Sequence, residues 1–354
     1  MIHQQTMKAA VLHATKDLRY EDYPMPAIRP GHVLIKVRAA GICGSDIPRV
    51  LGTAAHFYPV VLGHEFSGEV VETGDGVTGL QPGDRVVAAP LVPCGICIDC
   101  QEGNYALCKQ YTFIGSREQG GFAEFVVIPA SNAIKFSSKY SFAQAALFEP
   151  AGVALHGLIQ NHYAGGGTVA ILGAGTIGIF TGQWAKIFGG EKVAFYDVDE
   201  ERLQTATEIT GGIGINLQKE NARDTALNLT GGKGFSYVFG TSGASQTINT
   251  AYAIAGNKAH ICFIGTPTQP VVFTAEEWEL MNRREFTVTG SWMSYSAPFP
   301  GREWTLTAAM MDQGRLNFDK RFIFKEFPLA HCAQAFECFE YPEQVKGKIL
   351  LINE

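Results

Sequence analysis

The sequence predicts an α/β protein in which a β-rich domain is interrupted by an inserted, doubly wound domain with a parallel sheet. The first observation is that, before about residue 155, short apolar runs are divided by Gly-Asp and Pro-Gly turn signals. The second is that, after about residue 165, strand-like and helix-like runs alternate, which indicates βαβ units with right-handed crossovers. We therefore expect the β-rich domain over 1–157 and 291–354, and the inserted domain over 158–290.

The first part of the chain contains four runs with the pattern of strands. In His32–Ala39, apolar Val33, Ile35 and Val37 recur at every second position, as in a strand that is buried on one face. The other three runs are Glu69–Glu72, Arg85–Ala89 and Phe122–Ile128. Glycine makes up 40 of 354 residues, about 11% against a usual value near 7%, which agrees with many tight turns.

The inserted domain begins with Thr168–Leu172, a short apolar strand, and a helix-period run follows to about Phe188. The alternation then continues through strand Lys192–Tyr196, helix Glu200–Ile209, strand Ser236–Phe239, helix Ser245–Ile254, strand Lys258–Ile264 and strand Phe286–Thr289. A segment rich in proline and aromatic residues follows from residue 291, after which we expect a helix and closing strands.

The composition is that of a globular protein, with 46% hydrophobic and 18% charged residues. Lys and Arg number 28 against 34 Asp and Glu, so the formal net charge of −6 offers no footprint for nucleic acid or an anionic membrane. The longest apolar window that we identify, Thr168–Phe180, has about 13 residues, well below the roughly 20 that span a bilayer. The N-terminus lacks the apolar core of a secretory signal. We expect a cytoplasmic protein without nucleic-acid or membrane partners.

Four of the eight cysteines form a cluster with the spacing C-x2-C-x2-C-x7-C. They are Cys94, Cys97, Cys100 and Cys108. In a cytoplasmic chain such a cluster indicates a metal site rather than disulfides, and four thiolates can close a tetrahedron around zinc. An iron–sulfur motif begins identically, but its last gap is three residues and proline follows it. Here the last gap is seven residues and Lys109 follows, which favours zinc over iron–sulfur.

A G-x-G-x-x-G sequence follows the first strand of the inserted domain and opens the next helix, as a dinucleotide-binding fingerprint requires. Its residues are Gly173, Ala174, Gly175, Thr176, Ile177 and Gly178. Glycines there permit a tight turn and a close approach of the backbone to a pyrophosphate, so we predict a Rossmann domain. Asp197 ends the next strand and would accept from ribose hydroxyls, which favours NAD, while nearby Arg202 leaves NADP use open. The alternative is that Asp197 is only a turn residue.

A second candidate metal site involves Cys43, which follows the strand at 32–39, and His64, which precedes the next apolar run. Cysteine, histidine and a carboxylate are the ligands of catalytic zinc sites that keep one position open. Spacing alone only suggests this pairing, because a single histidine more often satisfies a hydrogen bond in a core. Cys262, Cys332 and Cys338 lie in apolar or helical contexts, and we interpret them as core residues.

Several motifs occur in the order expected of one family: GICGSD at 41–46, a GHE-x2-G-x5-G-x2-V run at 63–77, PGDRV at 82–86, the four-cysteine segment, GGFAEF at 120–125 and GAGTIG at 173–178. On these motifs the chain resembles the zinc-containing medium-chain dehydrogenase/reductase superfamily over essentially its whole length after Met7. The FEP sequence at 148–150 resembles the polyol dehydrogenase branch, in which a glutamate replaces a ligand cysteine. The resemblance implies a GroES-like catalytic domain with an inserted Rossmann domain.

The resemblance also implies two zinc ions per subunit, one catalytic and one structural. Cys43, His64 and Glu149 would hold the catalytic ion, and the four clustered cysteines would hold the structural ion. Glu65 would either support the catalytic site from behind or exchange with Glu149 as ligand.

The same resemblance implies a mechanism in which zinc polarises the substrate alcohol, Ser45 accepts the hydroxyl proton and hydride passes to NAD. Many family members carry a histidine five residues after the ligand cysteine, as the outer end of a proton relay. Here that position is Pro48, so the relay must end at Ser45 and water, or use another base.

The segments YPVVLGHEFSG, YTFIGSREQGGFAEF and GSWMSYSAPFPGREW resemble a member of the polyol dehydrogenase branch. This resemblance implies oxidation of a secondary alcohol of a polyol phosphate. The expected substrate is galactitol 1-phosphate, which would give tagatose 6-phosphate. A phosphate needs a basic anchor, for which Arg49 and Arg117 are the candidates, with Arg302 less favoured. His56 is a candidate for contact with substrate hydroxyls.

Two alternatives stay open at this point. One is a dehydrogenase of a free polyol or vicinal diol, of the sorbitol or butanediol type. The other is a non-catalytic protein that binds NAD, against which the retained ligand set argues. In either dehydrogenase we expect a homodimer or homotetramer, with strand Phe286–Thr289 pairing across a two-fold axis.

Overall fold

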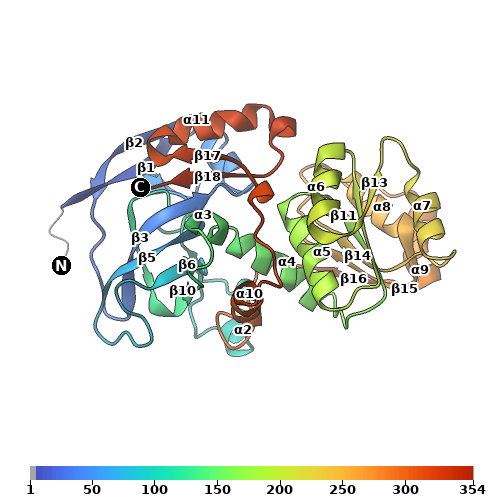
Figure 1. Cartoon of the computed structure of the whole chain (residues 1–354), viewed down its shortest axis with the longest axis horizontal. Coiled ribbons are helices and arrows are strands. Elements are labelled where there is room, and N and C mark those ends of the chain that lie inside the picture. The colour runs from blue at the N-terminus through green and yellow to red at the C-terminus, as the bar shows by residue number, and fades with distance from the viewer. Residues whose placement is uncertain (1–4, 354) are drawn as a thin grey trace. The chain divides into compact units, whose positions relative to one another are not determined.

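The computed structural model describes residues 5–353, which form two compact units (Figure 1). The first unit comprises the chain up to Glu149, Tyr295–Gly314 and the chain from Phe318 onward. The second comprises Pro150–Ser294 and Arg315–Asn317. The α/β class is confirmed, because the first unit is built mainly from antiparallel strands and the second on a parallel sheet. The domain limits drawn from the sequence stay a prediction.

The first unit is organised around β3 (His32–Gly41), a long strand with three antiparallel neighbours. These neighbours are β5 (Glu65–Thr73), β9 (Phe125–Pro129) and β18 (Lys348–Ile352). The same sheet contains β6 (Arg85–Ala88), β10 (Ala133–Lys135) and β17 (Ile323–Pro328). Gly41 of β3 faces both Glu65 of β5 and Leu350 of β18, so segments far apart in sequence meet at this end of β3.

Two smaller sheets and several short helices complete the first unit. The small sheets consist of β1 (Thr6–Ala14), β2 (Asp17–Pro24) and β4 (Val60–Val61), and of β7 (Leu91–Val92) and β8 (Thr112–Phe113). The α-helices are α1 (Ile47–Val50), α2 (Ile98–Gln101), α3 (Phe142–Ala145), α10 (Arg302–Asp312) and α11 (Cys332–Glu337). Short 3₁₀ helices lie at Tyr105–Leu107, Ala130–Asn132, Lys320–Phe322, Leu329–His331, Cys338–Glu340 and Pro342–Gln344. Buried aliphatic and phenylalanine side chains from β1, β3, β5, β9 and α11 form one core.

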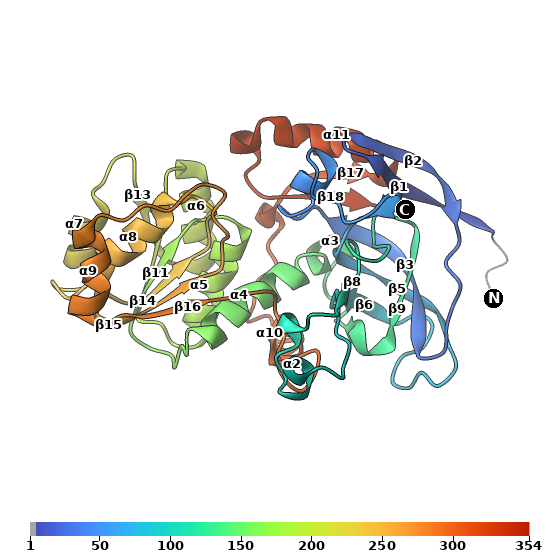
Figure 2. The ribbon, with the colours of Figure 1, turned by 180° about the vertical axis from the view of Figure 1, so that it is seen from behind.

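The second unit is a six-stranded parallel sheet in the order β13-β12-β11-β14-β15-β16. Its strands are β11 (Thr168–Leu172), β12 (Lys192–Asp197), β13 (Ile213–Asn216), β14 (Phe235–Gly240), β15 (Ala255–Phe263) and β16 (Thr287–Gly290). Its helices are α4 (Phe148–Gln160), α5 (Thr176–Ile187), α6 (Glu200–Thr210), α7 (Ala222–Leu229), α8 (Gln246–Ile254) and α9 (Ala275–Arg284). Figures 1 and 2, viewed from opposite sides, show α5 and α6 on one face of the sheet and α8 and α9 on the other. The predicted doubly wound arrangement is therefore confirmed, and the strand order reverses between β11 and β14.

The strands and helices whose limits were predicted for the inserted domain occur within a few residues of those limits. No limits were predicted for β13, α4, α7 and α9. β13 has only 4 residues, lies at the sheet edge and contains a glycine, so its strand pattern is weak. α7 has 8 residues and a largely polar sequence. Its start is marked by Asn221, whose side-chain oxygen accepts from the backbone N–H groups of Arg223 and Asp224.

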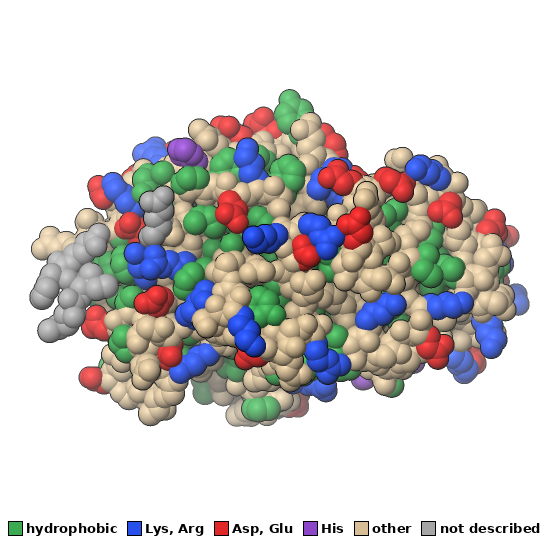
Figure 3. All heavy atoms as spheres, viewed as in Figure 1, with side chains coloured by type: hydrophobic (Ala, Val, Ile, Leu, Met, Phe, Trp, Pro, Cys, Tyr) green, Lys and Arg blue, Asp and Glu red, His purple; other side chains and the backbone are tan. Residues whose placement is uncertain are grey.

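One stretch, Phe142–Gln160, is long and apolar enough to cross a membrane by length and composition alone. It corrects the expectation that Thr168–Phe180 is the longest apolar window, because α3 and α4 follow one another almost directly. The structure buries 72% of its apolar window, as it would a core helix of a globular protein. On the face drawn in Figure 3, basic and acidic side chains are interspersed, in line with the small net charge.

Candidate functional site

The four clustered cysteines converge in a lobe of the first unit formed by α2 and the segments on either side of it. The Sγ atoms of Cys94, Cys97, Cys100 and Cys108 all lie within 4.8 Å of one another. The backbone N–H groups of Cys94 and Cys97 donate to the Sγ atoms of Cys108 and Cys94, each over 3.4 Å. Donors aimed at sulfur favour the thiolate form, which is the form that binds a metal.

The thiol pKa values in this lobe agree with a metal-binding role. Backbone hydrogen bonds from Ile96 and Cys97 lower the pKa of Cys94 to about 6. Burial raises the pKa of Cys100 to about 12, so this thiol needs a cation beside it to ionise at neutral pH. Four sulfur ligands without an open position fit a structural zinc ion.

A second cluster forms where β3 and β5 lie side by side. Ligand atoms of Cys43, His64 and Glu65 lie within 4.8 Å of one another. Cys43 comes just after β3 and Glu65 starts β5, and the pairing of Gly41 with Glu65 brings these positions together. Gly63 permits the turn before His64, because its φ of 95° is one that side chains disfavour. Sulfur, nitrogen and oxygen from three residues fit a zinc site that keeps a position open.

Asp46 is fully buried beneath this cluster and was not singled out from the sequence. One of its carboxylate oxygens accepts from the backbone N–H of Cys43 over 3.0 Å. The other lies 3.5 Å from Nδ1 of His64. Burial on its own would lower the pKa of His64, but Asp46 and Cys43 raise it well above its usual value. A carboxylate on one ring nitrogen of a histidine orients the other nitrogen toward a metal.

Lys348 from β18 also reaches this cluster, and the sequence held no local signal for it. Its Nζ lies 2.5 Å from each carboxylate oxygen of Glu65. The Glu65 side chain is 2% exposed and the Lys348 side chain is 12% exposed. Burial on its own would lower the pKa of Lys348, but the charge of Glu65 raises it far above its usual value. Lys348 is therefore a cation that neutralises Glu65 inside the first unit.

Glu149, at the start of α4, lies outside the group of ligand atoms that surrounds Cys43 and His64. It is nevertheless close enough to interact electrostatically with the cluster. Burial and the negative charge of Glu65 raise the pKa of Glu149 to about 7. Two carboxylates, Glu65 and Glu149, thus flank Cys43 and His64. Glu65 lies nearer to these two residues than Glu149 does.

Ser45, the expected proton acceptor, is exposed and is hydrogen bonded to Arg49. Nη1 of Arg49 donates to the Oγ of Ser45 over 2.8 Å and to its carbonyl oxygen over 2.6 Å. The same nitrogen lies 3.5 Å from Asp46. Arg49 occupies the turn of α1 directly after Pro48, so it sits beside the position where many family members carry a histidine.

Two of the other candidate substrate residues, His56 and Arg117, lie near Arg49. Partial burial lowers the pKa of His56, and the charges of Arg117 and Arg49 lower it further, so these three side chains lie within electrostatic reach of one another. The guanidinium of Arg117 lies 4.7 Å from the centre of the Tyr111 ring. Arg302 is exposed at the start of α10, and no contact among the described residues joins it to this group.

The glycine-rich loop lies between β11 and α5 in the second unit, as predicted. Gly173 has a φ of 112°, which favours glycine. A Cβ on Gly178 would lie 1.9 Å from the carbonyl oxygen of Gly173, so only glycine allows the helix to pack this closely. A Cβ on Gly175 would meet nothing within 4 Å, which leaves open space at the helix start. The loop therefore fits the pyrophosphate of a dinucleotide.

Asp197 ends β12, next to this loop. One carboxylate oxygen accepts from the backbone N–H of Ala174 over 2.7 Å. The other accepts from the N–H groups of Val198 and Asp199, over 2.7 and 3.0 Å. Asp197 thus holds the loop in place and also places a negative charge at the end of the strand. Arg202 lies in the first turn of α6.

Comparison with protein families supports the two-domain interpretation. Residues 29–138 match the alcohol dehydrogenase GroES-like domain, and residues 176–309 match the zinc-binding dehydrogenase family. The predicted GroES-like and Rossmann combination is confirmed by these matches.

Individual relatives span the whole chain. Galactitol 1-phosphate 5-dehydrogenase of Escherichia coli K12 is 34% identical over 353 residues, which cover 98% of this chain and 100% of the relative. The crystal structure of galactitol-1-phosphate dehydrogenase from Escherichia coli superposes with a TM-score of 0.92 at 34% identity, covering 98% and 100% of the two chains. A sorbitol dehydrogenase of Bacillus subtilis is 32% identical over 75% of this chain and 76% of its own length.

A putative zinc-binding dehydrogenase from Sinorhizobium meliloti, solved with NADP bound, is 28% identical with a TM-score of 0.88 over 99% and 100% of the two chains. These matches agree with the motifs, with the two separate clusters of metal-ligand side chains and with the glycine-rich loop. The resemblance that the motifs suggested is thereby confirmed, and the chain is an oxidoreductase that belongs to the zinc-dependent alcohol and polyol dehydrogenase family.

Proposed function

We propose that this protein uses NAD to oxidise a secondary alcohol of a polyol phosphate, with galactitol 1-phosphate as substrate and tagatose 6-phosphate as product. The observation that carries the proposal is that Arg49 and Arg117 both act on His56, while Arg49 is hydrogen bonded to Ser45 and lies 3.5 Å from Asp46. The guanidinium group of arginine can donate two hydrogen bonds to one phosphate group, and a free polyol has no phosphate. The full-length similarity to galactitol 1-phosphate 5-dehydrogenase supports the same substrate.

The proposal includes two zinc ions per chain. Cys43 and His64, with Glu65 or Glu149, would hold the catalytic ion, while the four clustered cysteines would hold the structural ion. Zinc at the first site supplies Lewis-acid chemistry toward an alcohol oxygen, and NAD supplies the acceptor for hydride. The remaining tasks of catalysis belong to the side chains of this protein.

Ser45 would accept the proton of the substrate hydroxyl. Its oxygen already accepts a hydrogen bond from Arg49, which orients the hydroxyl and leaves a second lone pair for the incoming proton. Because Ser45 is exposed, its own proton can pass directly to water. In this arrangement Arg49 takes over the orienting part of the relay, and no histidine at position 48 is needed.

The proposed preference for NAD rests on Asp197. Its carboxylate stands at the end of β12 and would repel the 2′-phosphate of NADP. The NADP in the Sinorhizobium meliloti relative means that family membership alone does not settle the cofactor.

We also propose a cytoplasmic homodimer or homotetramer. β16 lies at the edge of the parallel sheet and carries exposed Val288. Pairing of this strand with its copy would cover an open edge.

Turnover on matched substrates tests the proposed function. NADH formation is measured with galactitol 1-phosphate, galactitol and sorbitol under the same conditions. We expect kcat/KM for the phosphorylated polyol to exceed that for either free polyol at least roughly tenfold, because a charge-assisted contact contributes on that scale. Equal turnover of free sorbitol would instead favour the second candidate, a free-polyol dehydrogenase like the Bacillus subtilis relative.

A further inference from the structure

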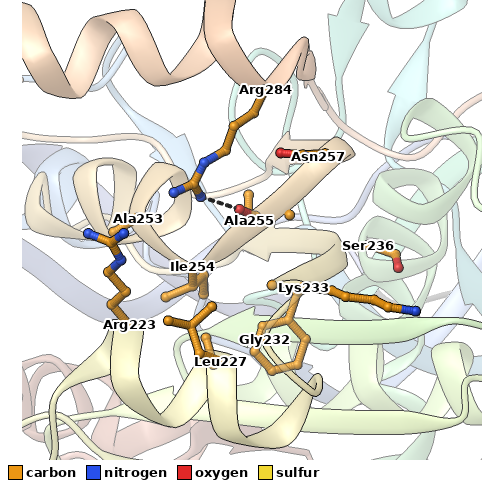
Figure 4. A pocket seen from close by; sticks show the side chains of 14 residues that line it. Arg223, Leu227, Gly232, Lys233, Ser236, Ala253, Ile254, Ala255, Asn257 and Arg284 are labelled. Carbon is orange, nitrogen blue, oxygen red and sulfur yellow. Dashed lines mark hydrogen bonds between the residues drawn. The ribbon is translucent and has the colours of Figure 1, made fainter.

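A hollow of about 670 Å³ opens in the second unit, and none of the candidate residues discussed above lines it (Figure 4). Its walls are one face of α7, the loop between α7 and β14, the last turn of α8 and the last residue of α9. It therefore lies at the amino ends of β14 and β15. We call it the Arg223–Arg284 pocket, after the two arginines that line it.

The pocket is separate from the glycine-rich loop. β11 and β14 are parallel neighbours, and Leu172 at the carboxyl end of β11 pairs with Gly240 at the carboxyl end of β14. Gly173 follows Leu172, whereas the pocket surrounds Phe235 at the opposite end of β14. The length of the strands, roughly 17–20 Å for six residues, separates the two places.

The lining carries positive charge and no acid. Arg223, Lys233 and Arg284 contribute to it, and its other residues are apolar residues, glycines, Ser236 and Asn257. Within residues 5–353, no ion pair joins any of the three cations to a carboxylate. Nearby cations differ in this respect, because Arg283 pairs with Glu279 and Lys258 pairs with Glu285.

The two arginines face one side of the pocket together. Figure 4 shows the Arg223 and Arg284 guanidinium groups approaching from α7 and α9, while Lys233 extends across to the side of Ser236. Nη1 of Arg284 donates to the carbonyl oxygen of Ala255 over 2.5 Å, which holds this side chain in place. Burial lowers the pKa of Arg284, and the positive charge of Arg223 lowers it further.

Two guanidinium groups that feel each other's charge are destabilised unless an anion lies between them. One N–H of Arg284 is used on Ala255, so most of its five donors stay available. Guanidinium forks match the oxygens of a phosphoryl group, and two forks can hold one group from two directions. The volume exceeds that of phosphate alone, and Leu227 and Ile254 offer apolar surface for a carbon skeleton.

We propose that the Arg223–Arg284 pocket binds the phosphoryl group of a small phosphorylated molecule. The site is distinct from the cofactor loop and from the substrate site, so it does not depend on the function proposed above.

Calorimetric titration with inorganic phosphate tests this site. The titrated protein carries Arg49→Gln and Arg117→Gln and is saturated with NADH. The substitutions remove both proposed substrate anchors, and NADH fills the cofactor loop. Potassium chloride at equal ionic strength provides the reference titration. We expect saturable binding of phosphate with a stoichiometry of about one per chain, and no saturable heat from chloride.

Variants then assign the site. In the same background, Arg223→Gln should weaken phosphate binding roughly tenfold, and adding Arg284→Gln should weaken it further. Arg283→Gln is the matched control, because Arg283 neighbours Arg284 but pairs with Glu279, and it should leave the affinity unchanged. Arg223→Gln removes no hydrogen bond of the described side chains, so a folding defect will not mask its effect. No saturable binding, or binding that Arg223→Gln leaves intact, would overturn the proposal.

A second titrant identifies the source of the phosphoryl group. Glycerol 3-phosphate should bind more tightly than inorganic phosphate if the apolar surface contacts a carbon skeleton. Equal affinities would assign the pocket to phosphate itself, and weaker binding of glycerol 3-phosphate would contradict an organic ligand.

Discussion

Lys348 binds both carboxylate oxygens of Glu65, with Nζ 2.5 Å from each, and thereby sets the charge beside Cys43 and His64. A carboxylate that is paired with a lysine binds a metal ion less readily. The same carboxylate can coordinate the metal ion when the lysine no longer contacts it. If zinc binds at this cluster as proposed, the choice between Glu65 and Glu149 as its ligand would depend on a residue of β18.

Lys348→Met should destabilise the first unit by about 3 kcal/mol, because it leaves the buried Glu65 without a partner. Lys348→Arg should restore most of the stability, since it keeps the positive charge. Urea unfolding of the zinc-loaded protein measures both effects. Lys320→Met, at an exposed position, is the control and should change little. A Lys348→Met protein as stable as the parent would show that the ion pair contributes nothing.

Zinc content should distinguish the two clusters. We expect two zinc ions per chain by elemental analysis, and one after Cys43→Ala, which should abolish turnover but leave the fold intact. Cys97→Ser should lower stability, because three thiolates remain where the lobe offers four. One zinc ion, or iron, in the folded parent protein would contradict two zinc sites.

Asp197→Ala should narrow the preference for NAD over NADP by removing the charge that repels a 2′-phosphate. It should also weaken binding of both cofactors, because Asp197 holds the backbone of Ala174. Asp197→Asn loses the charge but keeps one acceptor oxygen, for either Ala174 or the Val198 and Asp199 N–H groups. It should therefore weaken cofactor binding less than Asp197→Ala while narrowing the preference similarly. The ratio of kcat/KM for the two cofactors is the measurement. Parent protein that uses NADP as well as NAD would rule out this role for Asp197.

Arg117→Gln should raise KM for galactitol 1-phosphate roughly tenfold and leave weak turnover of free galactitol unchanged. A structural defect would instead depress both activities together. Arg302→Gln is the matched control, because the structure joins Arg302 to none of the other candidate substrate residues that it describes. Equal losses on both substrates would remove Arg117 as a phosphate anchor.

Light scattering should give the mass of a dimer or tetramer at micromolar concentration. Val288→Asp, which places a charge on the exposed edge strand β16, should shift the mass toward that of the monomer. Val272→Asp changes an exposed valine outside the strands and is the control. A parent protein that is already monomeric would exclude assembly through β16.

The features that could be predicted from the sequence are those whose residues lie close together along the chain. The four cysteines and the glycine-rich loop each lie within a short segment, and the strand-to-helix rhythm of the second unit follows apolar periodicity over adjacent residues. Lys348 could not be found this way, because it lies 283 residues from Glu65 and only the pairing of β18 with β3 brings them together. Asp46 was inside a quoted motif, but its burial and its hydrogen bond to Cys43 depend on packing.

The position of β18 has a consequence for biosynthesis. Nearly all of the second unit is one continuous segment, Pro150–Ser294, so its sheet can assemble while the ribosome is still making the rest. The first unit cannot finish its sheet until residues 348–352 emerge, because β18 pairs with β3. The second unit, with its glycine-rich loop, can therefore fold before Lys348 stands beside Glu65, so the cluster around Cys43 and His64 is completed after the glycine-rich loop.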